Sequence, residues 1–188
     1  LDSEYVLLGN IHPALQMHVL DQLQTDPFVL ADTIDLWIDI EREALLALIK
    51  KVSLFVINDS EAEELTNESN VILAGKKLMD MGPESVIVKK GEHGAILFHK
   101  QGMFSLPAFP VTELRDPTGA GDSFAGALIG RLASRRKTDF QSIKEAMIYA
   151  TCTASLTVEE FGCDRLESAG VTAIADRAES LRQLISPN

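Results

Sequence analysis

The stretch Asp116–Ala127 combines glycines, small residues and a carboxylate in a pattern that could bind and transfer a phosphate group. It reads Asp-Pro-Thr-Gly-Ala-Gly-Asp-Ser-Phe-Ala-Gly-Ala, a loop that runs directly into an apolar helical pattern. Gly119 and Gly121 lack a Cβ atom, so the backbone around Ala120 can turn several N–H groups toward one point. Because these groups lie at a predicted helix N-terminus, the helix dipole adds to their attraction for an anion. The loop therefore predicts a phosphate cradle that needs no cationic side chain.

Asp122 lies within this cradle, where its carboxylate would be repelled by a bound phosphate unless it has a proton to accept. A hydroxyl that attacks a γ-phosphoryl group needs such an acceptor within hydrogen-bond reach. We therefore interpret Asp122 as a general base. The alternative is that its charge only stabilises the helix N-terminus, by about 0.3–1 kcal/mol.

Two better-known glycine loops do not fit the spacing. A P-loop requires the full pattern G-x-x-x-x-G-K-[ST], and no stretch of the chain supplies it. A dinucleotide-binding fingerprint requires a glycine three residues after Gly121, where this chain has Phe124.

The elements that must position this loop alternate between short apolar runs and longer helical patterns, which is typical of βα units on a mainly parallel sheet. Strands are expected at Tyr5–Leu8, Phe28–Ala31, Leu54–Ile57 and Ser85–Lys89, and helices at Ala14–Gln24, Arg42–Lys51 and Asn70–Met81. The runs Ala95–His99 and Met103–Leu106 predict a hairpin that turns the sheet antiparallel. Three long helices are expected at Gly119–Arg135, Phe140–Glu160 and Ser168–Ile185, with Gly162 as a C-cap. The fold class is therefore α/β.

Composition limits the classes of function. The 188 residues are 46% hydrophobic, which predicts a single domain with one substantial core. No run approaches the roughly 18 apolar residues of a membrane span, and we expect a cytoplasmic protein. A formal charge of -11 argues against nucleic-acid or membrane partners. The two cysteines, Cys152 and Cys163, lack metal-ligand spacing and are expected to be reduced.

Asp116–Ala127 resembles the C-terminal signature of the ribokinase-like (PfkB) family of carbohydrate and nucleoside kinases. Asn58-Asp59-Ser60-Glu61 resembles the family's N-x-x-E element, and Val86–Gly94 resembles its nucleotide-side strand and glycine turn. The three stretches occur in the family's chain order. The resemblance implies a three-layer α/β/α fold and transfer of the γ-phosphoryl group of ATP to a hydroxyl of a sugar or nucleoside.

The same resemblance implies roles for individual residues. The catalytic set is Asp122 with the anion hole of Gly119, Ala120 and Gly121, and the ATP side comprises Asn58, Glu61, Lys89, Gly91, Gly94, Thr118 and Cys152. Glu61 would bind Mg²⁺, largely through water, and Asp116 a monovalent cation such as K⁺. Cys152 lies in the small-residue stretch Tyr149–Ser155, on which the family rests the adenine ring. Asp32 and Asp35 follow a strand and so lie at the carboxyl edge of the sheet, where either could contact the substrate, and a hydrogen-bonded loop carboxylate is an equal alternative.

Each of these assignments has a structural alternative. Asn58 and Glu61 also suit an ordinary helix start, and taken alone that interpretation is favoured. Lys89 could be a solvated residue at a strand end, and Asp116 could only form the turn before Pro117. Close helix packing would equally explain small residues around Cys152.

Family members normally begin with a segment that carries a G-G substrate motif and a small β lid, and neither occurs in the 188 residues. We therefore expect the chain to be the later part of such a protein, with its substrate shell largely in the absent segment. A kinase for a vitamin precursor and a nucleotide-binding fragment without turnover remain alternatives, and a homodimer is left open. Gly-Ala-Gly-Asp at residues 119–122 favours the carbohydrate branch.

Overall fold

The computed structural model describes residues 2–186, which form two compact units. The first unit runs to Gly91 and includes Ala95–Ser105, and the second comprises Glu92–Gly94 and the chain from Leu106 onward. The predicted mainly parallel sheet flanked by helices is confirmed.

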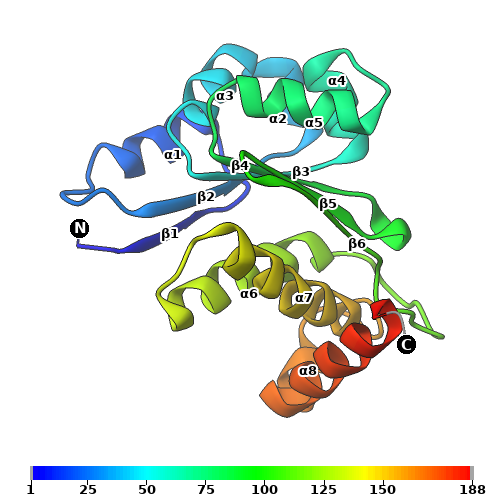
Figure 1. Cartoon of the computed structure of the whole chain (residues 1–188). Helices are drawn as coiled ribbons and strands as arrows, with labels where there is room; N and C mark the ends of the chain where they lie inside the picture. Colours follow the sequence, from blue (N-terminus) through cyan, green and yellow to red (C-terminus); the bar gives the residue numbers. More distant parts are fainter. Residues whose placement is uncertain (1, 187–188) are drawn as a thin grey trace. The chain divides into compact units, whose positions relative to one another are not determined.

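The first unit contains a sheet with strands in the order β1 to β6 (Figure 1). The strands are β1 (Tyr5–Leu8), β2 (Phe28–Asp32), β3 (Leu54–Asn58), β4 (Ser85–Lys89), β5 (Ala95–His99) and β6 (Gly102–Leu106, whose last residue belongs to the second unit). The first four are parallel, and β5 pairs antiparallel with β4, as the sequence predicted. Because the carboxyl ends of β1 to β4 share one edge, the loops after these strands meet there.

Five helices cover one face of this sheet (Figure 1). They are α1 (Pro13–Leu20), α2 (Asp35–Ile40), α3 (Arg42–Ile49), α4 (Asp59–Thr66) and α5 (Val71–Asp80). The strand order follows the chain, and parallel strands are usually joined by right-handed crossovers, so every connecting helix is expected on the same face. Leu45, Leu48, Phe55 and Ile57 are fully buried in the core between these helices and the sheet.

Gly75 allows α5 to pack closely on β5. A Cβ atom at this position would overlap the ring of Phe98, which is 2% exposed. The pair explains why a glycine occurs in the middle of a helix, where it normally costs about 1 kcal/mol relative to alanine.

The second unit contains three helices, α6 (Ala120–Arg135), α7 (Phe140–Thr157) and α8 (Asp164–Ile185). α7 packs against both α6 and α8, and its sequence is correspondingly rich in buried small residues. α8 is interrupted at Gly170, which has a φ of 65° and a ψ of -179°.

Several predicted boundaries were wrong. α1 ends at Leu20 rather than Gln24, α7 ends at Thr157 with Val158 as its C-cap, and α8 begins at Asp164. Gly162 therefore lies in the loop between helices, although its φ of 61° is left-handed as a C-capping glycine would be. The short helix α2 was not predicted from the sequence.

Candidate active site

The Asp116–Asp122 loop folds into a tight turn that leads into α6. The Asp116 Oδ1 atom accepts a hydrogen bond of 2.9 Å from the Thr118 N–H group, and the Ala120 N–H group donates to the Pro117 carbonyl at 3.2 Å. Gly119 is the N-cap of α6 and has a φ of 79°, a conformation that favours glycine. Its carbonyl accepts from the Ser123 N–H group at 2.9 Å. The loop geometry thus depends on a glycine at position 119.

The first turn of α6 is available to bind an anion. No side chain caps this helix, and within residues 2–186 the N–H groups of Gly121 and Asp122 have no hydrogen-bond acceptor. The Asp122 side chain is exposed, and in the same described residues its carboxylate makes no hydrogen bond or ion pair. A free carboxylate beside two free N–H donors is compatible with a general base next to an anion hole, and both roles stay predictions. Ala120, which was assigned to that anion hole, instead donates its N–H group to the Pro117 carbonyl.

Asp116 has a structural role in the turn. The bond from the Thr118 N–H group, together with a bond from the Thr118 side chain, lowers the pKa of the Asp116 carboxyl below its ordinary value. Asp116 is therefore negatively charged at neutral pH, which suits a cation ligand as well as a turn. The turn-forming interpretation is confirmed, and the cation role stays a prediction.

Cys152 lies on the buried part of α7. The thiol is fully buried, and burial raises its pKa to about 11. The neighbouring hydroxyls bond to their own helix, with Thr153 donating to the Tyr149 carbonyl at 2.8 Å and Ser155 to the Cys152 carbonyl at 2.7 Å. Close packing of α7 accounts for these small residues, and the contact between Cys152 and a nucleotide remains a prediction.

In the first unit, Asn58 and Glu61 form a reciprocal cap at the start of α4. The Asn58 Oδ1 atom accepts from the Glu61 N–H group at 2.8 Å, and the Glu61 Oε2 atom accepts from the Asn58 N–H group at 2.9 Å. This is a capping box, so the helix-start interpretation is confirmed. A role in binding ATP phosphates and Mg²⁺ is compatible with it and remains untested.

Glu61 has an unusual environment for a capping residue because only 7% of it is exposed. Burial raises the pKa of its carboxyl, while the bond from the Asn58 N–H group and the charge of Lys89 act in the opposite direction. Lys89 ends β4 and pairs in register with Asn58 at the end of β3. The structure thus brings together three of the predicted ATP-side residues, Asn58, Glu61 and Lys89.

The glycines after β4 have different environments. Gly91, in the 3-10 turn Gly91–His93, has a φ of 53° and free space around the position of a Cβ atom. Gly94 has a φ of 87°, and a Cβ atom there would overlap the carbonyl oxygen of Leu106. Gly94 is thus required by the backbone, and the nucleotide contact suggested for it from the sequence stays a prediction.

Asp32 and Asp35 lie at the carboxyl end of β2 and the start of α2. Asp32 is 5% exposed, whereas Asp35 is exposed and its Oδ1 atom accepts from the Leu36 N–H group at 2.8 Å. The charge of Asp35 contributes to the raised pKa of Glu61, after the larger effect of burial. Asp35 therefore lies within electrostatic reach of the capping box.

Sequence reasoning missed the polar residues that join the strand ends. Gln16 Nε2 donates to the carbonyls of Leu8 at 3.2 Å and Gly9 at 2.9 Å, after β1. Trp37 Nε1 donates to Asn10 Oδ1 at 2.8 Å, so Trp37 links α2 to the loop after β1. Gln16 Nε2 also lies 3.4 Å from the carbonyl of Asp32, the last residue of β2. No spacing signal marks Gln16 and Trp37, because each has a partner in a different βα unit.

Within residues 2–186 no group of three or more His, Cys, Asp or Glu side chains could hold a metal ion. The same residues contain no helix long and apolar enough to cross a membrane. A cation bound at Glu61 would thus depend on water and ligand oxygens for most of its coordination, as Mg²⁺ commonly does.

Comparison with known proteins identifies the family. The model of the pfkB family of carbohydrate kinases matches residues 15–169. The aminoimidazole riboside kinase of Salmonella typhimurium is 34% identical over 123 residues, which are 65% of this chain and 37% of that protein. The chain therefore belongs to the pfkB family of carbohydrate kinases, as the loop and strand motifs indicated.

Solved structures support the same fold. The aminoimidazole riboside kinase from Salmonella enterica, complexed with aminoimidazole riboside and an ATP analog, has a TM-score of 0.68 at 26% identity and covers 85% of this chain and 53% of its own. Ribokinase from Thermotoga maritima has a TM-score of 0.72 at 24% identity, covering 96% and 57% respectively, and this likeness concerns the fold alone. The chain spans about half the length of these structures.

Proposed function

We propose that the protein transfers the γ-phosphoryl group of Mg·ATP to a hydroxyl group of a sugar or nucleoside, with Asp122 as the general base. The observation that carries this proposal is the first turn of α6, where the free Asp122 carboxylate adjoins the free N–H groups of Gly121 and Asp122 in the described chain. Membership of the pfkB family, and relatives named for riboside, ribose and nucleoside kinases, support the substrate class.

In this mechanism Asp122 accepts the proton of the attacking hydroxyl as the oxygen approaches phosphorus. The backbone N–H groups of Gly121 and Asp122 donate to the phosphoryl oxygens, whose negative charge they stabilise without a cationic side chain, whereas the Ala120 N–H group is already bonded to the Pro117 carbonyl. The left-handed Gly119 holds the donors in place, since a β-carbon would strain this backbone conformation.

Asn58, Glu61 and Lys89 act on the nucleotide side. The buried Glu61 carboxylate suits a divalent cation held partly through water, and Lys89 suits the nucleotide phosphates. Bound Mg²⁺ would neutralise phosphate charge. Asp116, whose carboxyl is charged at neutral pH, is the proposed ligand of a monovalent cation such as K⁺.

Acceptor identity is proposed to depend on the carboxyl edge of the sheet, where Asp32 ends β2 and Asp35 begins α2. Carboxylates there can accept hydrogen bonds from sugar hydroxyls. Asp35 is the more accessible of the two carboxylates, because it is exposed whereas Asp32 is only 5% exposed.

The test is ADP release in the presence of magnesium, across a panel of sugars, nucleosides and vitamin precursors, for the full chain and an Asp122→Asn variant. Acceptor-dependent release should fall by roughly 10²-fold or more in the variant, the scale of general-base loss. Asp164→Asn is the matched control, because Asp164 is also an exposed aspartate in the first turn of a helix but lacks the glycine loop.

If Asp122 only stabilises its helix, the two variants should behave alike and both should retain turnover. ATP binding without acceptor-dependent turnover in the unaltered chain would instead indicate a nucleotide-binding protein and refute the kinase proposal.

A further inference from the structure

The end of α7 supports both ends of the Asp116–Asp122 loop. The Val158 carbonyl accepts from the N–H groups of Arg115 at 2.8 Å and Asp116 at 3.3 Å, where the loop begins. The Thr157 hydroxyl donates to Ser123 Oγ at 2.8 Å, where the loop enters α6. The conformation of the loop therefore depends on where residues 157 and 158 lie.

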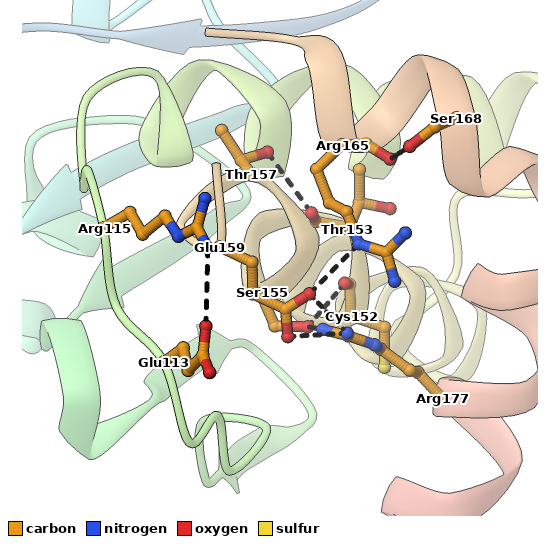
Figure 2. Close-up of polar contacts among 10 residues, drawn as sticks. All are labelled: Glu113, Arg115, Cys152, Thr153, Ser155, Thr157, Glu159, Arg165, Ser168 and Arg177. Atoms are coloured by element: carbon orange, nitrogen blue, oxygen red, sulfur yellow. Dashed lines mark hydrogen bonds and ion pairs between the residues drawn. The ribbon is translucent and has the colours of Figure 1, made fainter. Parts of the chain in front are cut away.

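Glu159, the next residue, is held by two arginines of α8 (Figure 2). Arg177 Nη2 donates to both carboxylate oxygens of Glu159, at 2.7 and 2.8 Å, and Arg165 Nε donates to Oε2 at 3.3 Å. The Arg177 and Glu159 side chains are only 17% and 21% exposed. Charge-assisted pairs with this shielding and geometry are stronger than ordinary surface ion pairs.

Arg177 makes two further contacts that bear on the loop. Its Nη1 atom donates to Ser155 Oγ at 2.8 Å, so one guanidinium spans the last turn of α7 and the residue beyond it. The guanidinium also lies 5.0 Å from the ring centroid of Phe109, in the segment that leads to the loop. Arg177 thus joins α8, the end of α7 and the approach to the loop.

We propose that Arg177 and Glu159 are positioning residues, which hold the end of α7 so that the Asp116–Asp122 loop keeps the shape needed for phosphoryl transfer. This inference rests on the proposed function for its catalytic consequence. Neither side chain is assigned a contact with substrate. They act through Thr157 and Val158.

A second ion pair of α8 supplies a matched control. Arg182 Nη2 donates to Glu145 Oε2 at 2.9 Å, joining α8 to α7 far from the end that contacts the loop. Glu159→Gln removes one charge from a pair that joins α8 to the segment after α7, and Glu145→Gln removes one from a pair that joins α8 to α7. Only Glu159→Gln should disturb the loop.

Hydrogen exchange of the Arg115 and Asp116 amides reports on the loop independently of activity. We expect Glu159→Gln to speed exchange of these amides by roughly tenfold, through easier local opening, and Glu145→Gln to leave them near their original rates. Equal rates in the two variants would overturn the proposal.

Kinetics then test the catalytic consequence. We expect kcat to fall roughly 10- to 100-fold in Glu159→Gln, with a much smaller change in KM for ATP. This is the usual range for residues that orient the groups of a site without contacting the substrate. Arg177→Lys should keep more activity than Arg177→Met, because lysine retains the positive charge. It should still be less active than the unaltered chain, because lysine lacks the planar guanidinium that bonds both oxygens of Glu159. Faster amide exchange in Glu159→Gln with an unchanged kcat would overturn the positioning role. No turnover in the unaltered chain would instead refute the kinase proposal. In that case the amide exchange rates alone would decide whether Glu159 and Arg177 hold the loop.

Discussion

Replacing Glu61 with glutamine should separate its helix-capping role from its proposed role at the nucleotide. The Glu61 carboxylate is buried and accepts the Asn58 N–H bond at 2.9 Å. A glutamine carbonyl can accept the same bond without placing a charge in that environment. We therefore expect Glu61→Gln to be at least as stable as the unaltered chain at pH 7, and yet to lose most phosphoryl transfer because the cation ligand is neutral.

The stability difference between the glutamine and alanine variants can be calculated from the interactions that an alanine at position 61 would remove. Glu61→Ala loses one hydrogen bond, a net contribution of about 1 kcal/mol, and one buried methylene, about 0.8 kcal/mol. The alanine variant should thus be roughly 2 kcal/mol less stable than the glutamine variant, or about 1 M lower in urea midpoint for a slope near 2 kcal/mol per molar.

The dependence on pH has a definite sign. Because burial raises the pKa of Glu61 above its ordinary value of 4.5, the native state binds more protons than the unfolded state between the two pKa values. Stability from this group is therefore greatest below pH 4.5 and falls as pH rises through the native pKa. Glutamine does not titrate, so the advantage of Glu61→Gln should be largest at pH 7 and should shrink as the pH is lowered toward 4.5.

Urea unfolding at pH 7 and pH 5, followed by circular dichroism, would measure these differences. Glu63→Gln is a suitable control, since Glu63 is exposed on the same helix and its replacement should change stability by no more than about 0.5 kcal/mol. A Glu61→Gln chain that is clearly less stable than the unaltered chain at pH 7, or a stability difference that does not vary with pH, would contradict a destabilising buried charge at Glu61.

Two further predictions concern packing and cysteine reactivity. Gly75→Ala should destabilise the chain by about 1–3 kcal/mol in urea unfolding, because its Cβ atom would overlap the Phe98 ring. Gly130→Ala should instead stabilise the chain by about 0.5–1 kcal/mol, because this glycine of α6 has free space around the position of a Cβ atom. Iodoacetamide at pH 8 should label the exposed Cys163 but not Cys152, whose thiol is buried and has a pKa of about 11, and mass spectrometry should find labelling of both only in denaturant.

The strands were well predicted because their residues are apolar in short, continuous runs. Tyr5–Leu8, Ser85–Lys89 and Ala95–His99 have the predicted bounds. The short helix α2 was missed because its six residues are too few to show a helical period, and because Asp32 and Asp35 were considered only as residues after a strand that could contact the substrate. Local pattern therefore determined the sheet better than it did the short connecting helices.

Local chemistry also explains which parts of the candidate site could be predicted. Asn58 and Glu61 are close in the sequence and Lys89 ends a neighbouring strand, so motif spacing and parallel pairing together bring them to one place. Arg177 and Glu159 belong to no such motif. Their contact depends on how α8 packs against the end of α7, which is a tertiary property that no sequence period encodes.

Polar residues at a helix start are ambiguous in sequence because capping and anion chemistry use the same N–H groups. The structure distinguishes between them by the bonds each side chain makes. Asn58, Asp116 and Asp139 all accept hydrogen bonds from nearby backbone N–H groups, which gives each a local structural role. Asp122 makes no such bond within residues 2–186, and α6 begins without a side-chain cap. A carboxylate that does not cap its own helix contributes little to folding through hydrogen bonds. For this reason we assign proton transfer to Asp122 and not to the other three residues.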